Sequence, residues 1–369
     1  MIRLRRGIVT ALGEARRGAH ELEVRVEDAD TSERAIAYPD LVGPVTAGDL
    51  VLLNTTAVEL GLGTGGAHFV VAVLDAAPTA GADPAPGRVM KARYTPVQTA
   101  VASVEETHRD ELEGSKGLEG VPVVCAPLHS MLGPIAAGAK VAGGGAGVVY
   151  VMTDGAALPG AFSRLVTRLR DAGLIDGWIT CGQAFGGELE AVTVWTGMLA
   201  AKEILKAQVI VVADGPGNLG TDTTWGVSAL GGGNSLNAAA ALGGRPLAAL
   251  RISFADRRER HRGVSHHSLT ILERVCLVET LVPVPSLADE HQREAVWDAI
   301  RKVNLDGRHQ PVEVRAEPAL DELARRGVEI TSMGHSVGED PALFLGAGAA
   351  GVLAGRMAAR DRNWRETAH

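Results

Sequence analysis

The segment 251–269, RISFADRRERHRGVSHHSL, gathers arginines, histidines and carboxylates beside small residues. Guanidinium groups bind phosphates and carboxylates through paired hydrogen bonds. Arg260, His261 and Arg262, which precede Gly263, are therefore the better candidates for contact with an anionic ligand. The preceding Arg257 and Arg258 could equally form surface ion pairs with neighbouring acids, which contribute little to stability.

Two adjacent histidines, His266 and His267, follow in the same segment. The pattern predicts a helix over 265–275 with Ser265 as its N-cap. Both histidines then lie in the first turn, where the helix dipole favours the neutral imidazole. A neutral histidine can accept a proton near pH 7. Because adjacent helical residues point in different directions, we expect at most one of them to face a ligand, and simple packing or capping is the alternative.

A glycine-rich segment, DGPGNLGTDT at 214–223, is the best candidate for anion binding. Glycines let backbone N–H groups turn toward an oxyanion, and threonines add hydroxyl donors. The candidate contacts in this segment are Gly215, Gly217, Asn218, Gly220, Thr221 and Thr223. The spacing is neither GxGxxG nor a P-loop, so it does not indicate a nucleotide. A long glycine turn after a buried strand is the alternative interpretation.

Carboxylates complete the expected catalytic group. We expect His266 or His267 to move a proton, and Asp214 or Asp256 to orient that imidazole or a substrate hydroxyl. Asp214 could instead cap its own loop. Other polar residues follow predicted strands, and among them Ser130 and Asp154 are candidate substrate contacts, with turn capping as the alternative for Asp154.

Oxygen and nitrogen ligands for a metal are available at Asp154, Asp214, Asp256, His261, His266 and His335. No HxH, HExxH or DxD spacing supports such a site, so the sequence assigns no metal ligand and no cofactor.

These residues need a framework, and from Val121 onward the pattern predicts one. Continuous apolar runs alternate with helical stretches, which is typical of a parallel sheet covered by helices on both faces. The apolar runs lie at 121–127, 147–154, 177–180, 208–215, 245–253, 276–285, 311–315 and 328–334. The predicted helices lie at 159–173, 187–207, 265–275, 287–304, 318–327 and 340–360. Ligands of such sheets bind at the carboxyl ends of the strands, where the candidate residues are expected to meet.

The first part of the chain has a different pattern. Short apolar runs separated by Gly, Pro, Asn and Asp predict a small all-β barrel or sandwich. We therefore expect a β module over 1–115, with a linker near 76–87, followed by a doubly wound, Rossmann-like, mostly parallel α/β domain over 116–369.

Composition limits the class of protein. The 369 residues carry a formal net charge of −8, which disfavours binding to nucleic acid or to an anionic membrane. Aromatic residues make up only 4%, which argues against a base-stacking surface. The N-terminal MIRLRRG lacks the apolar region of a secretion signal, and the apolar stretch 342–359 is expected to be a buried helix. The three cysteines without CxxC spacing fit reduced thiols in a cytoplasm.

Three motifs are distinctive: CGQAFGGELEAVTVW, ADGPGNLGT and SFADRRERHRGVSHHSLT. Their combination resembles a bacterial family known only as a domain of unknown function. The likeness spans nearly the whole chain, but it implies no activity and no catalytic residues.

The sequence therefore favours an enzyme that acts on a small anionic metabolite, phosphorylated metabolites included, through histidine acid/base chemistry. Hydrolysis and group transfer are the favoured reaction classes. The alternative is a non-catalytic protein that binds or senses the same kind of metabolite. The expected partner is this small anionic ligand, and a homo-oligomer stays open.

Overall fold

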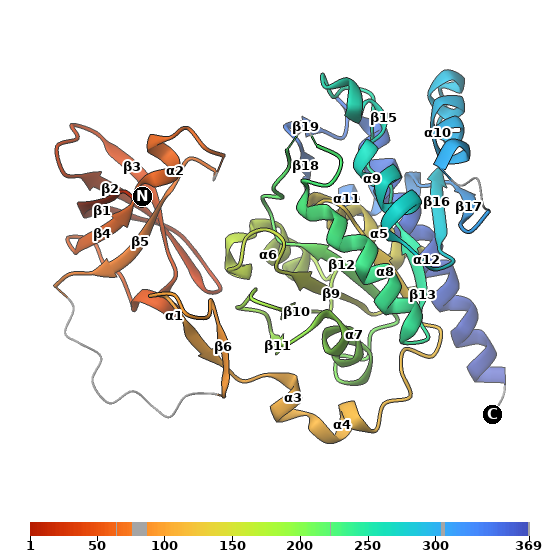
Figure 1. Ribbon diagram of the computed structural model, residues 1–369, viewed down its shortest axis with the longest axis horizontal. Coiled ribbons are helices and arrows are strands. Elements are labelled where there is room, and N and C mark those ends of the chain that lie inside the picture. The colour runs from red at the N-terminus through yellow and green to blue at the C-terminus, as the bar shows by residue number, and fades with distance from the viewer. Residues whose placement is uncertain (64, 76–86, 222, 304–306, 368–369) are drawn as a thin grey trace. The chain divides into compact units, whose positions relative to one another are not determined.

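The computed structural model describes residues 1–367, except 64, 76–86, 222 and 304–306, and only the backbone of 361–367. The chain divides into two compact units, Met1–Val101 and Ala102–His369 (Figure 1). The linker expected at 76–87 lies outside the described residues, except for Gly87.

The first unit contains a closed barrel, which confirms the predicted small β module. Its strands are β1 (Leu4–Arg16), β2 (Ala19–Val26), β3 (Ser32–Ala37), β4 (Leu50–Asn54) and β5 (His68–Val73), joined in the order β1-β2-β3-β5-β4. Side chains alternate between the two sides of a strand, so Leu22 and Val24 pack inside while Glu23 and Arg25 face solvent. The unit also holds α1 (Pro39–Val42), α2 (Thr56–Glu59) and the paired strands β6 (Val89–Lys91) and β7 (Thr99–Val101).

The second unit is built on a parallel sheet, as the continuous apolar runs predicted. The described strands pair in the order β11-β10-β9-β12-β8-β13-β16-β17, each parallel to its neighbours. Their bounds are β8 (Pro122–Cys125), β9 (Val148–Thr153), β10 (Gly177–Cys181), β11 (Leu189–Ala191), β12 (Val209–Asp214), β13 (Arg245–Ala248), β16 (Leu281–Pro285) and β17 (Gln310–Val314). The fold is therefore a doubly wound α/β domain.

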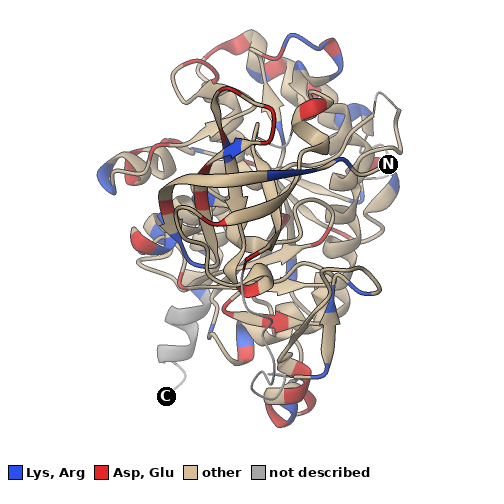
Figure 2. Ribbon diagram, turned by 90° about the vertical axis from the view of Figure 1, so that its left-hand side faces the viewer, with Lys and Arg blue, Asp and Glu red and all other residues tan. Residues whose placement is uncertain are grey.

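Helices cover both faces of this sheet and enclose two hydrophobic cores. One core contains α5 (Leu132–Ala142), α6 (Arg164–Asp171), α11 (Glu317–Arg325) and α12 (Pro341–Thr367). The other contains α7 (Val194–Glu203), α8 (Gly231–Ala241) and α10 (Glu290–Val303). Adjacent strand residues such as Val123 and Val124 belong to opposite cores, so each strand is apolar on both faces. Charged residues lie mainly on loops, helices and barrel strands (Figure 2). The short helices α3 (Val104–Thr107) and α4 (Arg109–Glu113) precede the sheet.

Several predicted elements differ from the structure. The helix predicted over 187–207 begins only at Val194, because Leu189–Ala191 pairs with β10 as strand β11 and Thr193 caps the helix through the Thr196 N–H. The strand predicted over 328–334 does not join the large sheet. Instead β18 (Thr331–Ser332) pairs with β19 (His335–Ser336) across a tight turn in which Met333 and Gly334 have positive φ.

The run 245–253 is also divided in the structure. Strand β13 ends at Ala248, and Ile252–Ser253 forms β14, which pairs with β15 (Gly263–Val264) outside the large sheet. The chain leaves β8 toward β9 on one side and leaves β13 toward β16 on the other. Loops that diverge in this way open a crevice at the carboxyl ends of the strands.

Helix α12 packs closely against α5. A Cβ atom at Gly351 would lie 2.0 Å from the carbonyl oxygen of Ile135, so glycine is required for this approach. The part Pro341–Arg360 is long and apolar enough to cross a membrane, by length and composition, with a mean hydropathy of 1.5, but its apolar window is 72% buried inside the protein. Such burial is typical of a core helix, so this helix is weak evidence for a membrane span.

Candidate functional site

A cavity of about 370 Å³ lies at the carboxyl ends of β8, β12 and β13 in the second unit. Its volume falls within the usual range of small-molecule sites. Segments far apart in the sequence form its walls. The lining residues are Pro127–Ser130, Pro216–Thr221, Val227, Ala229, Arg251, Arg258, Arg260, His261, His267, Ser268 and Met333. The cavity therefore occupies the crevice that the strand order creates.

The glycine-rich segment forms one wall. Asn218 Nδ2 donates a hydrogen bond of 2.9 Å to the Pro127 carbonyl, which ties the segment to the end of β8. Gly217 has a φ of 90°, a conformation that favours glycine. Two backbone amides of the segment already have partners just beyond it, because Leu219 N–H donates to Ser228 Oγ and Thr221 N–H donates to the Gly226 carbonyl. Positive charge at the cavity comes from side chains.

Arginines supply that charge. Arg251, Arg258 and Arg260 line the cavity, and Asp256 accepts hydrogen bonds of 2.8 Å from the first two. Arg258 also donates through Nε to the other Asp256 oxygen, at 3.0 Å, so the contact is bidentate. The hydrogen bonds from Arg258 hold the pKa of Asp256 well below its usual range. Asp256 therefore positions arginines, and its ionised carboxylate is a poor proton acceptor.

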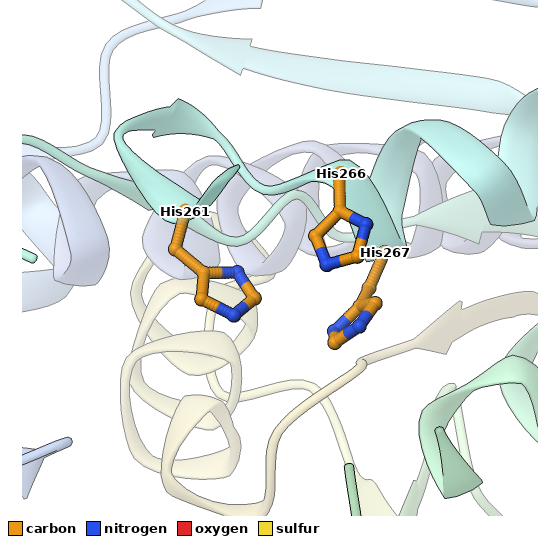
Figure 3. A group of neighbouring side chains, drawn as sticks. All are labelled: His261, His266 and His267. Atoms are coloured by element: carbon orange, nitrogen blue, oxygen red, sulfur yellow. The ribbon is translucent and has the colours of Figure 1, made fainter. Parts of the chain in front are cut away.

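Histidines lie beside the arginines. His261 precedes β15, and His266 and His267 begin α9 (His266–Thr270), which continues as a π-helical turn, Ile271–Val275. The rings of His266 and His267 have centroids 3.9 Å apart, and each centroid lies 5.1 Å from that of His261 (Figure 3). His261 and His267 line the cavity. The adjacent rings thus lie much closer together than their helical spacing led us to expect.

Burial and neighbouring charge keep two of these imidazoles neutral. Burial, with the Arg251 and Arg258 charges, lowers the pKa of His261 to about 3. Burial, with His266 and Arg251 nearby, lowers the pKa of His267 to about 4. Near pH 7 both rings therefore have a nitrogen lone pair that can accept a proton or bind a cation.

A second group of buried side chains surrounds His129, which also lines the cavity. His129 Nε2 lies 2.6 Å from Ser163 Oγ, and His129 Nδ1 lies 3.2 Å from the Tyr150 hydroxyl and 3.3 Å from the Asp214 carbonyl oxygen. The Asp214 carboxylate accepts hydrogen bonds from Thr153 Oγ1 at 2.6 Å and from the Gly155 N–H at 3.1 Å. Burial raises the pKa of Asp214. Asp214 thus joins the ends of β9 and β12.

The structure brings part of the predicted set together. The cavity is lined by Ser130, Gly217, Asn218, Gly220, Thr221, Arg260 and His267. The remaining candidates, Asp154, Asp214, Gly215, Thr223, Asp256, Arg262 and His266, are not among the residues that line it.

These remaining candidates have other contacts in the structure. Asp154 accepts a hydrogen bond of 2.7 Å from the Gln183 N–H, and Thr223 Oγ1 lies 2.8 Å from Thr221 Oγ1. Arg262 is exposed. At Gly215, an added Cβ would lie 2.4 Å from Met152 Cε, so this glycine permits close packing.

Sequence reasoning considered His261, but it did not select His129, Arg251 or Ser268 and left Arg258 as a possible surface ion pair. All five residues line the cavity. His129 stands next to Ser130 after the first strand, so its position carried the same signal. Arg251 was hidden inside an apolar run that was predicted as one strand. Its position becomes informative only once β13 is seen to end at Ala248.

Comparisons with known proteins give a family but no activity. No curated protein and no solved structure matches the chain. A family model described as a protein of unknown function (DUF3866) matches residues 34–351. The match takes in the end of the barrel's β3, the whole parallel sheet and all the residues that line the cavity. The chain therefore belongs to this family of unknown function.

Proposed function

We propose that the protein is an enzyme that acts on a small anionic metabolite in the cavity at the carboxyl ends of β8, β12 and β13. The observation that carries the proposal is convergence. Arg251, Arg258, Arg260 and His267 come from one segment, 251–267, and they line one cavity of about 370 Å³ together with the distant segments Pro127–Ser130 and Pro216–Thr221. A purely structural protein does not need arginines and a histidine clustered around a cavity, whereas a binding site for an anion does.

Charge favours an anion. Three guanidinium groups line the cavity, and Asp256 holds two of them, Arg251 and Arg258, in place. The low pKa values of His261 and His267 mean that these rings add no charge near pH 7. A phosphate or carboxylate group matches both the positive charge and the planar hydrogen-bond donors of arginine.

Proton transfer is the role that we assign to the imidazole at this cavity. His267 is 8% exposed, and within the described part of the chain its Nε2 is buried and has no hydrogen-bond partner. A neutral imidazole beside a bound anion can accept a proton from water or from a substrate hydroxyl. Hydrolysis and group transfer both use such a step, and the favoured substrates are phosphorylated metabolites.

A non-catalytic metabolite-binding or sensor protein is the second candidate. The contacts of the two expected carboxylates favour it, because Asp256 pairs with arginines and Asp214 bonds Thr153 and Gly155. In these contacts neither carboxylate orients an imidazole as a catalytic pair would. A measurement of catalytic turnover distinguishes the enzyme from the non-catalytic binding protein.

The test starts from ligand binding. Thermal unfolding is measured with inorganic phosphate and a panel of phosphorylated metabolites, for the wild type, Arg260→Gln and Arg262→Gln. Arg262 is the matched control, because it is two residues away and exposed outside the cavity. A ligand at 100 times its Kd stabilises the folded state by about 2.7 kcal/mol. We expect this gain in the wild type and in Arg262→Gln, with affinity at least tenfold lower in Arg260→Gln.

Turnover is then measured with each ligand that binds. Loss of reaction in His267→Gln with binding retained supports the enzyme, whereas binding without any reaction in the wild type favours the sensor. If no anion stabilises the wild type, or if both arginine variants behave alike, the proposal is wrong.

We expect the protein to work in the cytoplasm, which agrees with its three cysteines being buried free thiols.

A further inference from the structure

We propose that His261, His266 and His267 form a binding site for one divalent transition-metal ion, with zinc the best match, at the edge of the anion cavity. One ring nitrogen from each histidine lies within 4.8 Å of the other two. A tetrahedral zinc ion with bonds of about 2.0–2.1 Å holds its nitrogen ligands about 3.3 Å apart. Small rotations of the rings bring the three nitrogens to that spacing. Figure 3 shows the rings turned toward a common space.

The backbone around the site holds these histidines together. Strands β14 and β15 pair through Ile252 with Val264 and through Ser253 with Gly263, and this pairing closes the segment that carries His261. Gly263 has a φ of 76°, which only glycine adopts readily, and it directs the chain into α9. The Ser265 N–H also donates a hydrogen bond of 2.9 Å to the Arg251 carbonyl. The site therefore has a fixed scaffold.

The hydrogen bonds of the rings fit metal binding. Ser265 Oγ lies 2.8 Å from His261 Nδ1. When Nδ1–H donates to this oxygen, the Nε2 lone pair is left for an ion, and metal-binding histidines are commonly oriented in this way. His267 Nε2 is buried and, among the described residues, has no hydrogen-bond partner. Burial of an unsatisfied polar atom is costly, and coordination to an ion removes that cost.

The site meets the cavity on one side. His261 and His267 line the cavity, so an ion held by the three rings has a coordination position open to a ligand there. Three protein ligands with one open position is the arrangement of catalytic zinc sites. This consequence rests on the proposed function, because it makes the ion a partner of the bound anion. With the ion bound, the imidazoles would serve as its ligands instead of accepting a proton, and the ion would lower the pKa of water at the open position.

The experiment uses Co²⁺ alone as the probe, because its visible absorption reports nitrogen ligands and tetrahedral geometry. Metal-free protein is titrated with Co²⁺, and Zn²⁺ is added in competition. The variants are His261→Ala/His267→Ala, His267→Gln and Ser265→Ala. His291→Ala is the control, since His291 is an exposed histidine on α10. Thermal unfolding establishes that each variant folds.

For the wild type and His291→Ala we expect one Co²⁺ per chain with tetrahedral absorption that Zn²⁺ displaces. The double variant and His267→Gln should lose at least 100-fold in affinity. Ser265→Ala should bind one ion about 10- to 100-fold more weakly, because only the orientation of His261 is lost. If the double variant does not fold, the other two variants carry the comparison.

Two results would overturn the metal site: no stoichiometric Co²⁺ binding by the wild type, or undiminished binding by His267→Gln. In either case anion binding that depends on Arg260 would leave the proposed function standing. Conversely, one Co²⁺ bound per chain without any anion affinity would support the metal site and contradict the proposed function.

Discussion

Ser265 lies at the N-cap of α9, yet its side chain bonds His261 Nδ1 at 2.8 Å and makes no capping hydrogen bond to the helix. The residue thus has two effects. Its backbone begins the helix that carries His266 and His267, and its hydroxyl fixes the third ring from outside that helix. One serine therefore sets the relative positions of all three imidazoles.

Anion and metal binding should be coupled. Arg251, Arg258 and Arg260 surround the cavity, so a divalent ion beside them is repelled unless an anion neutralises part of the charge. We expect millimolar inorganic phosphate to raise the apparent Co²⁺ affinity about 5- to 150-fold, which is the usual span of coupling between sites. Co²⁺ should raise the affinity for phosphate by the same factor. Titration of each ligand at fixed concentrations of the other measures both factors, and independent affinities would contradict the coupling.

Removal of the Asp256 charge should destabilise the protein. In Asp256→Asn the buried charge of Arg251 loses the carboxylate that balances it, since the side chains of Arg251 and Asp256 are only 6% and 8% exposed. Breaking a buried ion pair in this way costs about 3 kcal/mol in the free energy of unfolding. The control is Asp298→Asn, because the exposed pair of Asp298 with Arg301 should change stability by less than about 0.5 kcal/mol. Denaturant unfolding measures both, and equal effects would show that Asp256 has no special role.

Acidification should destabilise the fold through His129. Burial lowers the pKa of folded His129 to about 4, whereas the unfolded chain has the ordinary value of about 6.5. Below pH 6.5 the unfolded state therefore binds a proton that the folded state does not, so this stability is complete above pH 6.5 and falls as pH is lowered to 4. The loss is about 3 kcal/mol at most.

Other groups that contact His129 are included in the design of this test. Ser163 and Tyr150 face the ring. The raised pKa of Asp214 has the opposite effect on stability, because on acidification the folded state binds this proton at a higher pH than the unfolded state does. Unfolding free energies from pH 4 to 7 are compared between the wild type and His129→Gln. The wild type should show the steeper fall below pH 6.5. Parallel curves would mean that His129 does not titrate as expected.

Alanine should have opposite effects on stability at two glycines, one at the contact between α5 and α12 and the other in α8. Gly351→Ala places a Cβ 2.0 Å from the Ile135 carbonyl oxygen, so the helices must separate, at a cost of about 1–3 kcal/mol or more. Gly232→Ala in α8 meets no atom within 4 Å, and the better helix propensity of alanine should stabilise the protein by up to about 1 kcal/mol. Thermal unfolding gives both signs. A stable Gly351→Ala protein would contradict the close packing.

Much of the fold could be predicted from local pattern. The run 208–215 contains β12, because a strand buried on both faces must be continuously apolar. Strand β11 could not be found in this way, since Leu189–Ala191 is too short to show a period and its pairing with β10 is a tertiary contact. The same limit applies to the division between β13 and β14, which depends on the partner of each strand.

The candidate site was predictable where position along the chain was enough. His267 and Arg260 were found from the helix start and from the arginine cluster, and both line the cavity. The contact of His129 with Ser163 joins residues far apart in the sequence, and the contacts of Asp256 with two nearby arginines depend on the local conformation of the segment that follows β14. The convergence of three imidazoles is likewise a property of the β14–β15 pairing, which no spacing motif records.

The strand order has a consequence for how the protein is made. β12 occupies the slot between β8 and β9, although it is synthesised after β9, β10 and β11. A growing chain that has produced only residues up to 208 lacks the strand that joins β8 to β9, so its sheet is in two pieces with unpaired edges. The arginines and imidazoles come later still. In a nascent fragment of this length the second unit therefore has neither a continuous core nor a place to bind a ligand, and its protection from aggregation falls to the ribosome and to chaperones.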